Sequence, residues 1–330
     1  MLISVVVPTY NRADLLLRWC LGSLCFQTLD PSQYEIIVVD NNSPDDTGKV
    51  VESFRTKLPN LRYLFEKRAG VALARNRGYW EARGDYVGYT DDDAMFPPRW
   101  LSLAATIIQD QKPEGFGGPF FPFYLETPPY WYKDSYGGWT HGDVVIDLPP
   151  NVHLSGMNMF FKRETLIATK GFPEELGHQG NKLAYGEEPA IQQSIRELFP
   201  AARIYYHPDL YVFHHHRHAK MTGYGHVYDS FTRGRYAVKV ARHSSQRSPS
   251  PGRLLNNLSR NVMGVAIDVM MGFPRRNRER YPYIMNYFYE VILPHLYQFG
   301  INYEALCALL GSHDASKIIP ACLKKNHGTH

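Results

Sequence analysis

Three consecutive aspartates, Asp91, Asp92 and Asp93, are the residues of this chain whose type and spacing best suit chemistry. They follow a short apolar run at 86–90, so they are expected at the end of a buried strand. Adjacent carboxylates repel one another, and burial makes that repulsion costly. A divalent cation relieves the repulsion, and hard oxygen ligands suit Mg²⁺ or Mn²⁺, which also bind phosphate oxygens. The alternative is a solvated acidic turn that caps the next helix.

The first 110 residues alternate strand-like and helix-like segments. Strands are predicted at 3–7, 34–39, 61–66 and 85–90, and helices at 13–24, 46–57, 71–82 and 99–110. Nearly continuous apolar strands that alternate with helices favour an α/β fold with a doubly wound parallel sheet. Ligands of such sheets bind beyond the carboxyl ends of the strands. The aspartates at 91–93, Asp40 and residues 8–10 all follow predicted strands, so we expect them to converge there.

The rest of the chain is less regular. Residues 115–150 are rich in glycine, proline and aromatic residues and predict loops with short strands. Further strands are predicted at 154–162 and 204–216, and a helix at 185–199. The Ser- and Pro-rich stretch 244–252 is typical of a linker, and residues 253–330 have a helical pattern.

Charge is unevenly distributed along the chain. Residues 196–280 carry fifteen basic and five acidic side chains, which indicates an anionic partner such as phosphate, nucleic acid or a membrane surface. The sequence contains no zinc-finger or RNP-like pattern, so nucleic acid is not expected as a partner. Aromatic residues make up 14% of the chain, which fits either a cleft for sugar rings or an ordinary core.

The sequence also bears on the compartment. Four cysteines without a CxxC pair favour reduced thiols in a cytosolic protein. The N-terminal residues predict a buried strand rather than a signal peptide, and no apolar run reaches the roughly eighteen residues of a spanning helix. We therefore expect a cytoplasmic protein, with peripheral contact to the inner face of the membrane as a further expectation.

Seven short segments in the first 240 residues occur in the order found in one enzyme family. They are VVVPTYNR (5–12), IIVVDNNS (36–43), GVALARNRG (70–78), YTDDD (89–93), GMNMFF (156–161), GFPEEL (171–176) and GEE (186–188). In this order the chain resembles the inverting nucleotide-sugar glycosyltransferases of family 2, which have the GT-A fold. The resemblance implies a Rossmann-like, mixed and mainly parallel sheet flanked by helices, with a helical C-terminal tail.

The resemblance also implies a domain plan and an activity. Residues 1–243 would form the catalytic domain, with a nucleotide-binding half at 1–110 and an acceptor-binding half at 111–243. A linker at 244–252 and a helical extension at 253–330 would follow. The implied reaction moves a sugar, with inversion, from a nucleotide diphosphate sugar, UDP-linked in this reading, to a hydroxyl of a carbohydrate or lipid-linked acceptor. A hexosyltransferase of this kind would act in polysaccharide, glycolipid or glycoconjugate assembly.

For the nucleotide, the resemblance implies a site at the ends of the first two strands. Asp40 would accept a ring N–H of the base, beside Pro8, Thr9, Tyr10 and Arg12. An acceptor at this point fits uracil N3–H and also guanine N1–H, so it does not identify the base. The alternative is that Asp40 caps the helix after its turn.

For the diphosphate, the resemblance implies a carboxylate site for Mn²⁺ or Mg²⁺. Asp93 and Asp91 would bind the metal or lie near the ribose, and Asp92 is ambiguous because three adjacent aspartates allow a shift of one residue. His214 would contact the metal or the diphosphate, unless it belongs to a solvated histidine cluster. Arg75 would add a fixed positive charge to the nucleotide site, unless it is a surface arginine of an amphipathic helix.

For the acceptor, the resemblance implies that Glu188 is the catalytic base and Glu187 the fallback. Pro189 is favoured in a first helical turn, where the helix dipole stabilises a carboxylate. The alternative is a pair of acids that only decorates the start of a helix.

Two other functions stay open at this point. A nucleotidyltransferase that forms nucleotide sugars usually has a Gly-rich basic segment after the first strand, but residues 8–14 contain no glycine. A catalytically inactive nucleotide- or nucleic-acid-binding protein is disfavoured by the intact aspartates and Glu188.

The tail contains an apolar run at 261–273 that is followed by arginines. The run is too short to cross a bilayer, and within 253–280 it is suited to lie in a membrane interface beside a lipid-linked acceptor. The alternative is a helix that packs on the catalytic domain.

Overall fold

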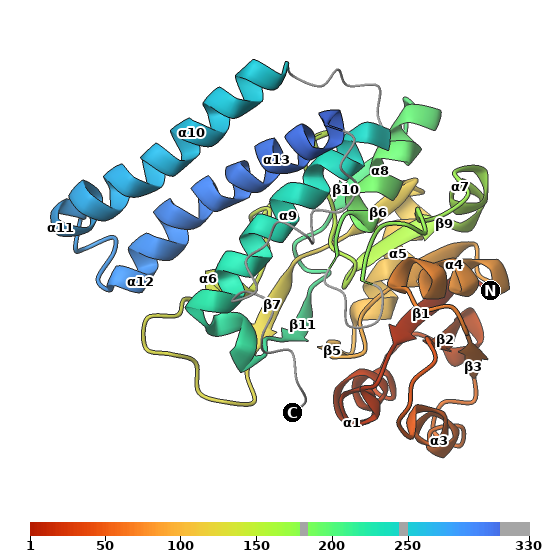
Figure 1. The fold of residues 1–330 in the computed structure, drawn as a ribbon. Helices are drawn as coiled ribbons and strands as arrows, with labels where there is room; N and C mark the ends of the chain where they lie inside the picture. The colour runs from red at the N-terminus through yellow and green to blue at the C-terminus, as the bar shows by residue number, and fades with distance from the viewer. Residues whose placement is uncertain (179–183, 244–249, 311–330) are drawn as a thin grey trace. The chain divides into compact units, whose positions relative to one another are not determined.

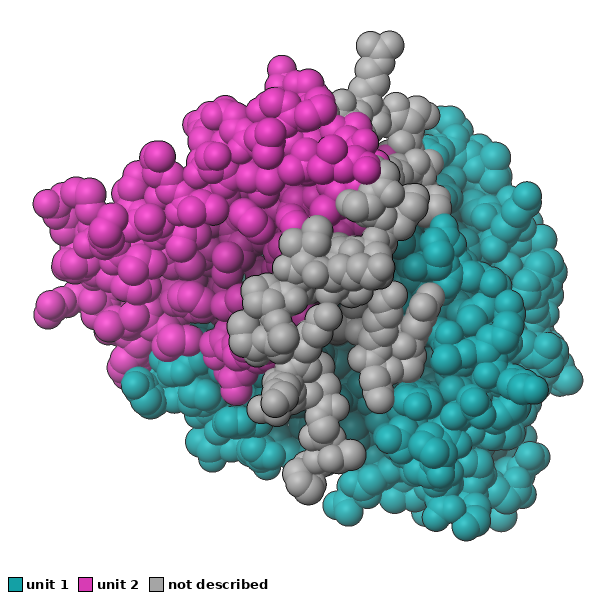
Figure 2. All heavy atoms as spheres, in the orientation of Figure 1, with its two compact units in different colours: residues 1–221 teal, residues 222–330 magenta. Residues whose placement is uncertain are grey.

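The computed structural model describes residues 1–178, 184–243 and 250–310. The chain divides into two compact units, residues 1–221 and 222–330 (Figure 2). The predicted boundary at residue 243 lies beyond this division, at the end of a helix that belongs to the second unit. Each unit is described by itself.

Within the described residues, eight strands of the first unit form one sheet (Figure 1). Their order across the sheet is β3 (Leu61–Phe65), β2 (Tyr34–Asp40), β1 (Ile3–Thr9), β4 (Tyr86–Tyr89), β9 (Met159–Lys162), β6 (Gly115–Gly117), β10 (Ile204–Tyr206) and β8 (Ile146–Asp147). β9 and β8 run antiparallel to their neighbours, and the other strands share one direction. The predicted mixed, mainly parallel sheet is therefore confirmed.

Helices cover both faces of this sheet. They are α1 (Ala13–Leu15), which continues through a π-helical stretch (Leu16–Leu21) into α2 (Gly22–Leu24), then α3 (Thr47–Ser53), α4 (Val71–Glu81), α5 (Trp100–Gln111), α7 (Arg163–Ala168) and α8 (Glu187–Leu198). The short helix α6 (Asp134–Gly137) instead contacts β7 (Phe120–Phe123), which lies outside this sheet. On β1, Val5 and Val7 pack in one hydrophobic cluster with Leu101 of α5. Val6 packs in a second cluster with Ile191 of α8. Since successive strand residues face opposite sides, both sides of an apolar strand need a cover.

One predicted strand is wrong. Residues 204–216 form two strands, β10 and β11 (Val212–His215), which belong to different sheets. A turn closed by the hydrogen bond from Leu210 N to His207 O separates them, and Pro208 within it has no N–H to continue a ladder. β11 pairs with β5 (Ala94–Met95) and β7 (Phe120–Phe123) in a three-stranded sheet. This second sheet brings the histidines beside the aspartates.

Two other predicted elements are shorter in the structure. The strand expected from residue 154 is paired only at Met159–Lys162, because Asn158 N closes a turn onto Ser155 O. The helix expected at 46–57 is regular only at Thr47–Ser53. The remaining strands and helices predicted in the first 110 residues are present within a few residues of their expected bounds.

The second unit is helical in its described residues. Its elements are α9 (Gly223–His243), α10 (Pro251–Ile267), a π-helical stretch (Asp268–Gly272), α11 (Phe273–Arg275), α12 (Ile284–Tyr287), a second π-helical stretch (Phe288–Ile292) and α13 (Leu293–Leu309). α13 packs on α9 and on α10. Gly234 of α9 and Gly300 of α13 let the two backbones approach closely, because an added Cβ would meet Tyr297 O at 2.0 Å or Phe231 O at 2.3 Å.

Much of the predicted linker, residues 244–249, lies outside the described residues, and so does the end of the predicted extension, 311–330. Pro251 and Gly252 of that linker belong to α10. Among the described residues, no helix combines the length and hydropathy that crossing a membrane requires.

Candidate active site

The carboxyl ends of three neighbouring strands bring the predicted site residues together. Thr9 at the end of β1 pairs with Asp40 at the end of β2. β4 lies on the other side of β1, and Thr90 N after it donates to Val6 O at 3.2 Å. The three aspartates follow at once, so they leave the sheet beside the end of β1. The expected convergence at this edge is confirmed.

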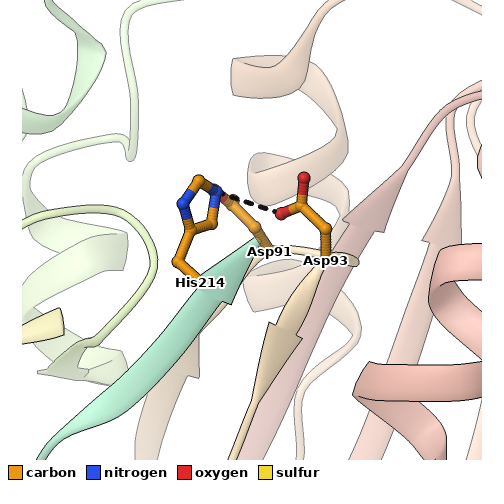
Figure 3. A group of neighbouring side chains, drawn as sticks. All are labelled: Asp91, Asp93 and His214. Carbon is orange, nitrogen blue, oxygen red and sulfur yellow. Dashed lines mark ion pairs between the residues drawn. The ribbon is translucent and has the colours of Figure 1, made fainter. Parts of the chain in front are cut away.

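Asp91, Asp93 and His214 form one group of possible cation ligands (Figure 3). One oxygen or nitrogen of each side chain lies within 4.8 Å of the others. Asp91 and Asp93 lie just before β5, and His214 comes from β11, which pairs with β5 through the register His214 to Ala94. His214 Nε2 lies 3.1 Å from Asp93 Oδ1. A strand pair of the small sheet thus places the imidazole over the carboxylates.

This group fits a divalent cation. Asp93 Oδ1 is buried, and its contact with His214 Nε2 does not have the geometry of a regular hydrogen bond. His214 Nδ1 is buried without a hydrogen-bond partner among the described residues. Burial acts to raise the pKa of Asp93, but His214, Arg12 and Arg217 outweigh it and hold the pKa well below its usual range. Asp93 is therefore an ionised carboxylate with a free lone pair toward its neighbours. Two carboxylates suit Mn²⁺ or Mg²⁺ as ligands, and a neutral imidazole is a further ligand for Mn²⁺.

Asp92 is held away from this group. Its two carboxylate oxygens accept hydrogen bonds from Thr9 Oγ1 at 2.8 Å and Arg12 Nη1 at 2.9 Å. Burial, reinforced by the charge of Asp93, raises the pKa of Asp92 to about 6, although Arg12 opposes the shift. Arg12 also donates to Asp93 Oδ2 at 3.1 Å, so it ties the aspartate loop to the end of β1.

Arg75 is buried and lies among three carboxylates. From α4 its Nη1 reaches Glu187 Oε1 at 2.8 Å, and its Nη2 lies 3.3 Å from Glu188 Oε1 and 3.6 Å from Asp91 Oδ1. The side chain is only 3% exposed, so the alternative of a surface arginine is excluded. Arg75 thus joins the two acids of α8 to the aspartate cluster.

Glu187 and Glu188 begin α8 and differ in exposure. The Glu187 side chain is 7% exposed, whereas the Glu188 side chain is 31% exposed. Gly156 N donates to Glu188 Oε1 at 2.9 Å, and an added Cβ at Gly156 would meet that oxygen at 2.0 Å. Burial and the adjacent Glu187 raise the pKa of Glu188 to about 7, against the opposing charge of Arg75. A carboxylate with this pKa can take a proton near neutral pH.

The predicted base-binding residue Asp40 is buried and already hydrogen bonded. Tyr63 Oη donates to one oxygen at 2.6 Å, and Ser43 N donates to the other at 2.8 Å. A carboxylate has about four lone-pair positions, so these bonds leave it able to accept a further N–H. Pro8 is buried within β1, and Tyr10 is partly exposed just beyond it.

Three residues of this site were missed by the sequence analysis. Arg217 Nη2 lies 3.5 Å from Asp93 Oδ2, Tyr63 bonds Asp40, and Gly156 holds Glu188. Gly156 opens one of the seven segments, so its position was a signal that could have been used. Arg217 follows the histidine run directly, but nothing in the sequence distinguishes it from the other arginines of that region.

Two solved structures share this fold. One is the mannosyltransferase PcManGT from Pyrobaculum calidifontis in complex with GDP-Man and Mn²⁺, with a TM-score of 0.62, 19% identity, and coverage of 92% of this chain and 86% of that chain. The other is the 1–349 fragment of S. aureus TarS in complex with UDP-GlcNAc, with a TM-score of 0.56, 18% identity, and coverage of 94% and 92%. At these identities the likeness shows the fold alone, which is the GT-A fold of glycosyltransferases.

The sequence comparisons give the family. The model of glycosyl transferase family 2 matches residues 4–168, half of the chain, and the chain belongs to this family. Glycosyltransferase AglE of Haloferax volcanii is 33% identical over 175 residues, which are 53% of this chain and 57% of that protein. The GalNAc(5)-diNAcBac-PP-undecaprenol beta-1,3-glucosyltransferase of Campylobacter jejuni is 28% identical over 193 residues, 57% of this chain and 58% of that protein. This chain therefore matches somewhat over half the length of each relative.

Family membership agrees with the class of enzyme, a glycosyltransferase, that the resemblance predicted. It disfavours the nucleotidyltransferase that the sequence analysis left open.

Proposed function

We propose that this chain transfers a sugar from a nucleoside diphosphate sugar, UDP-linked, to a hydroxyl of a carbohydrate or lipid-linked acceptor, with inversion and with Mn²⁺ or Mg²⁺. The observation that carries the proposal is that Arg75 contacts both Glu188 and Asp91. Asp91 belongs to the group of possible cation ligands with Asp93 and His214, so Glu188 lies near that group. A base and a cation site are the two centres that such a displacement needs.

The donor is assigned to the nucleotide-binding half, residues 1–110. Asp40 accepts the ring N–H of the base, and the backbone around Pro8, Thr9 and Tyr10 lines its site. Support comes from the adjacent ends of β1 and β2, where Thr9 and Asp40 pair. Arg12 contributes by holding Asp92 and Asp93 in place beside the nucleotide.

The cation is assigned to Asp91, Asp93 and His214. When bound, it neutralises the diphosphate and stabilises the charge of the leaving group. Arg75 adds fixed positive charge beside Asp91 on the donor side, and Asp92 stays close to the nucleotide without joining the ligand set. Manganese in the complex of the Pyrobaculum enzyme supports the choice of metal.

The base is assigned to Glu188. Its partly exposed carboxylate can reach an acceptor hydroxyl, whereas Glu187 is buried against Arg75. Glu188 takes the hydroxyl proton as the acceptor oxygen attacks the anomeric carbon from the face opposite the diphosphate. A single displacement with one base and no protein nucleophile inverts the anomeric centre. Glu187 is assigned a supporting role, because its ion pair fixes the position of the Arg75 guanidinium, which in turn contacts Glu188.

The acceptor is assigned to the half formed by residues 111–243. The name of the Campylobacter relative specifies a glycan on undecaprenol diphosphate, which supports a lipid-linked acceptor here. Action at the inner face of a membrane is a further part of the proposal. One structural neighbour is bound to GDP-Man and the other to UDP-GlcNAc, so donors with either nucleobase, guanine or uracil, are to be compared by experiment.

A donor panel tests this proposal. Purified protein is incubated with UDP- and GDP-sugars in Mn²⁺, in Mg²⁺ and in EDTA, and release of nucleoside diphosphate is followed. We expect release from UDP-sugars only with metal. The transfer is then repeated with a carbohydrate acceptor, because the anomers of a free sugar interconvert in water. The proton coupling constant of the new glycoside reports the anomer, and a retained configuration would rule out Glu188 as the base of a single displacement.

A further inference from the structure

Helix α10 has two apolar faces, and one of them is covered within its own unit. Leu254 is buried, Asn257 Nδ2 donates to Asn302 Oδ1 of α13 at 3.2 Å, and Gly264 abuts His295 of α13. These positions are three and seven residues apart, which places them on one side of the helix, and that side packs on α13. α13 in turn lies between α10 and α9 (Figure 1).

A second side of α10, together with the π-helical stretch after it, forms an exposed apolar surface, which we call the α10 face. It borders α13, because Val262 and Met263 line a hollow with Phe299. Met263 and Met270 are 63% and 69% exposed. The other large apolar side chains of the face are also exposed, and they are Leu255, Val262, Ile267, Val269 and Met271. Several exposed apolar side chains in one contiguous surface mark a contact site rather than ordinary scatter.

Charge is absent from the middle of this surface. Between Val262 and Phe273 the only charged residue is Asp268. Its carboxylate lies 2.8 Å from His295 Nε2, on the side of α10 that packs on α13. The α10 face therefore consists of exposed apolar side chains with no acidic side chain among them.

Arginines border the α10 face along one side and at its C-terminal end. Arg260 is exposed and lies three residues before Met263 and seven before Ile267, so it flanks the same side of the helix. Arg253 precedes it, and Arg275, Arg278 and Arg280 are exposed just beyond the face. Residues 253–280 hold six arginines against Asp268 and Glu279. Arginine side chains are long enough to keep their charge in water while their stems cover apolar surface.

We infer that the α10 face docks the protein on an anionic lipid bilayer, with Met263 and Met270 in the acyl boundary and the bordering arginines on lipid phosphates. An apolar helix face that is bordered by basic residues and too short to span is the arrangement of an interfacial helix. Its excess of positive charge complements an anionic leaflet. A second copy of this chain would instead bring the same arginines together, which disfavours a symmetric protein contact. The inference stands on the second unit alone and does not depend on the proposed reaction.

Vesicle sedimentation of the full chain tests this inference. Vesicles of phosphatidylcholine alone are compared with vesicles that also contain phosphatidylglycerol. We expect the protein to sediment with the anionic vesicles and to be released as salt is raised. Met263→Glu/Met270→Glu should lower the partition by about tenfold or more, because it places two carboxylates in the acyl boundary. Arg275→Gln/Arg278→Gln should weaken binding to anionic vesicles alone.

The matched control is Ile167→Glu/Leu198→Glu, which adds the same charges at apolar side chains that are 38% and 53% exposed in the first unit. It should sediment like the parent, and thermal melting should show that all variants fold. Failure of the parent to bind anionic vesicles, or equal binding by Met263→Glu/Met270→Glu, overturns the inference. Light scattering could instead show a dimer that Met263→Glu/Met270→Glu abolishes, with no binding to vesicles. That result would also overturn the inference and assign the α10 face to a contact with a second copy of the chain. Metal-dependent donor cleavage is measured in parallel, so a failure of the proposed reaction is seen separately.

Discussion

Arg75 and Glu187 form a buried ion pair, in which Nη1 of the arginine lies 2.8 Å from Oε1 of the glutamate. The side chains are 3% and 7% exposed. The second terminal nitrogen of the same guanidinium lies 3.3 Å from Glu188 and 3.6 Å from Asp91. One planar cation therefore connects the proposed base to the proposed cation site, and Glu187 fixes its position.

Replacing Glu188 by glutamine should abolish transfer while donor affinity stays nearly unchanged. The carboxylate is proposed to act on the acceptor hydroxyl, so the loss should appear in kcat, by about 10²–10⁴-fold. Steady-state kinetics and donor titration by calorimetry measure the two effects. Glu187→Gln is the matched variant, and it should keep more activity because its carboxylate is buried against Arg75. The reverse order of activities would move the base to Glu187.

Arg75→Met should destabilise the protein by about 3–5 kcal/mol, because it leaves Glu187 buried without its charge partner. Adding Glu187→Gln to Arg75→Met should recover part of this loss, since the double variant no longer buries that unpaired charge. Urea unfolding of the parent, both single variants and the double variant forms a complete cycle. Strictly additive changes in the free energy of unfolding would contradict the pairing.

Removal of divalent metal should abolish binding of a nucleoside diphosphate. Mn²⁺ or Mg²⁺ at Asp91, Asp93 and His214 would bind the phosphate oxygens, so excess EDTA should eliminate the heat of binding in calorimetry. Asp93→Ala should weaken binding in the presence of metal and also lower kcat. Asp209→Ala, which removes an exposed carboxylate from the turn between β10 and β11, is the control and should bind normally. Equal binding of the diphosphate in EDTA would remove the metal from the proposal.

Activity should depend on pH through Glu188. Burial and Glu187 raise its pKa to about 7, and a general base works only in its ionised form. The value of kcat/KM should therefore be nearly constant above this pH and fall about tenfold for each pH unit well below it. A pH series at saturating metal measures the profile. A rate that stays level through mildly acidic pH would mean that another group accepts the proton.

Local sequence patterns were sufficient for much of the fold. The apolar run of β1 predicted a strand buried on both faces, and the parallel order placed Asp40 and the aspartates at one edge. These inferences succeed because strand period and helix period depend on residues close in the sequence. The same reasoning predicted that Glu187 and Glu188 begin a helix, which α8 confirms.

Tertiary structure decided the contacts between distant residues. Arg75 and Glu187 are 112 positions apart, and no local pattern indicates that an arginine of α4 is buried against α8. His214 reaches Asp93 because residues 204–216 divide between two sheets, and the sequence predicted one strand there. Burial of a charge depends on which elements pack around it, which is a long-range property.

In the C-terminal tail, too, the sequence did not predict which side chains are buried. Its sequence predicted an apolar helix bordered by arginines, but α10 is apolar on more than one side. Periodicity does not tell which side another helix will cover. Packing of Gly264 against His295 decided it, and this packing left Met263 and Met270 exposed. The sequence by itself determines which side chains are apolar. Which of them are buried depends on the element, distant in the sequence, that packs against them in the folded chain.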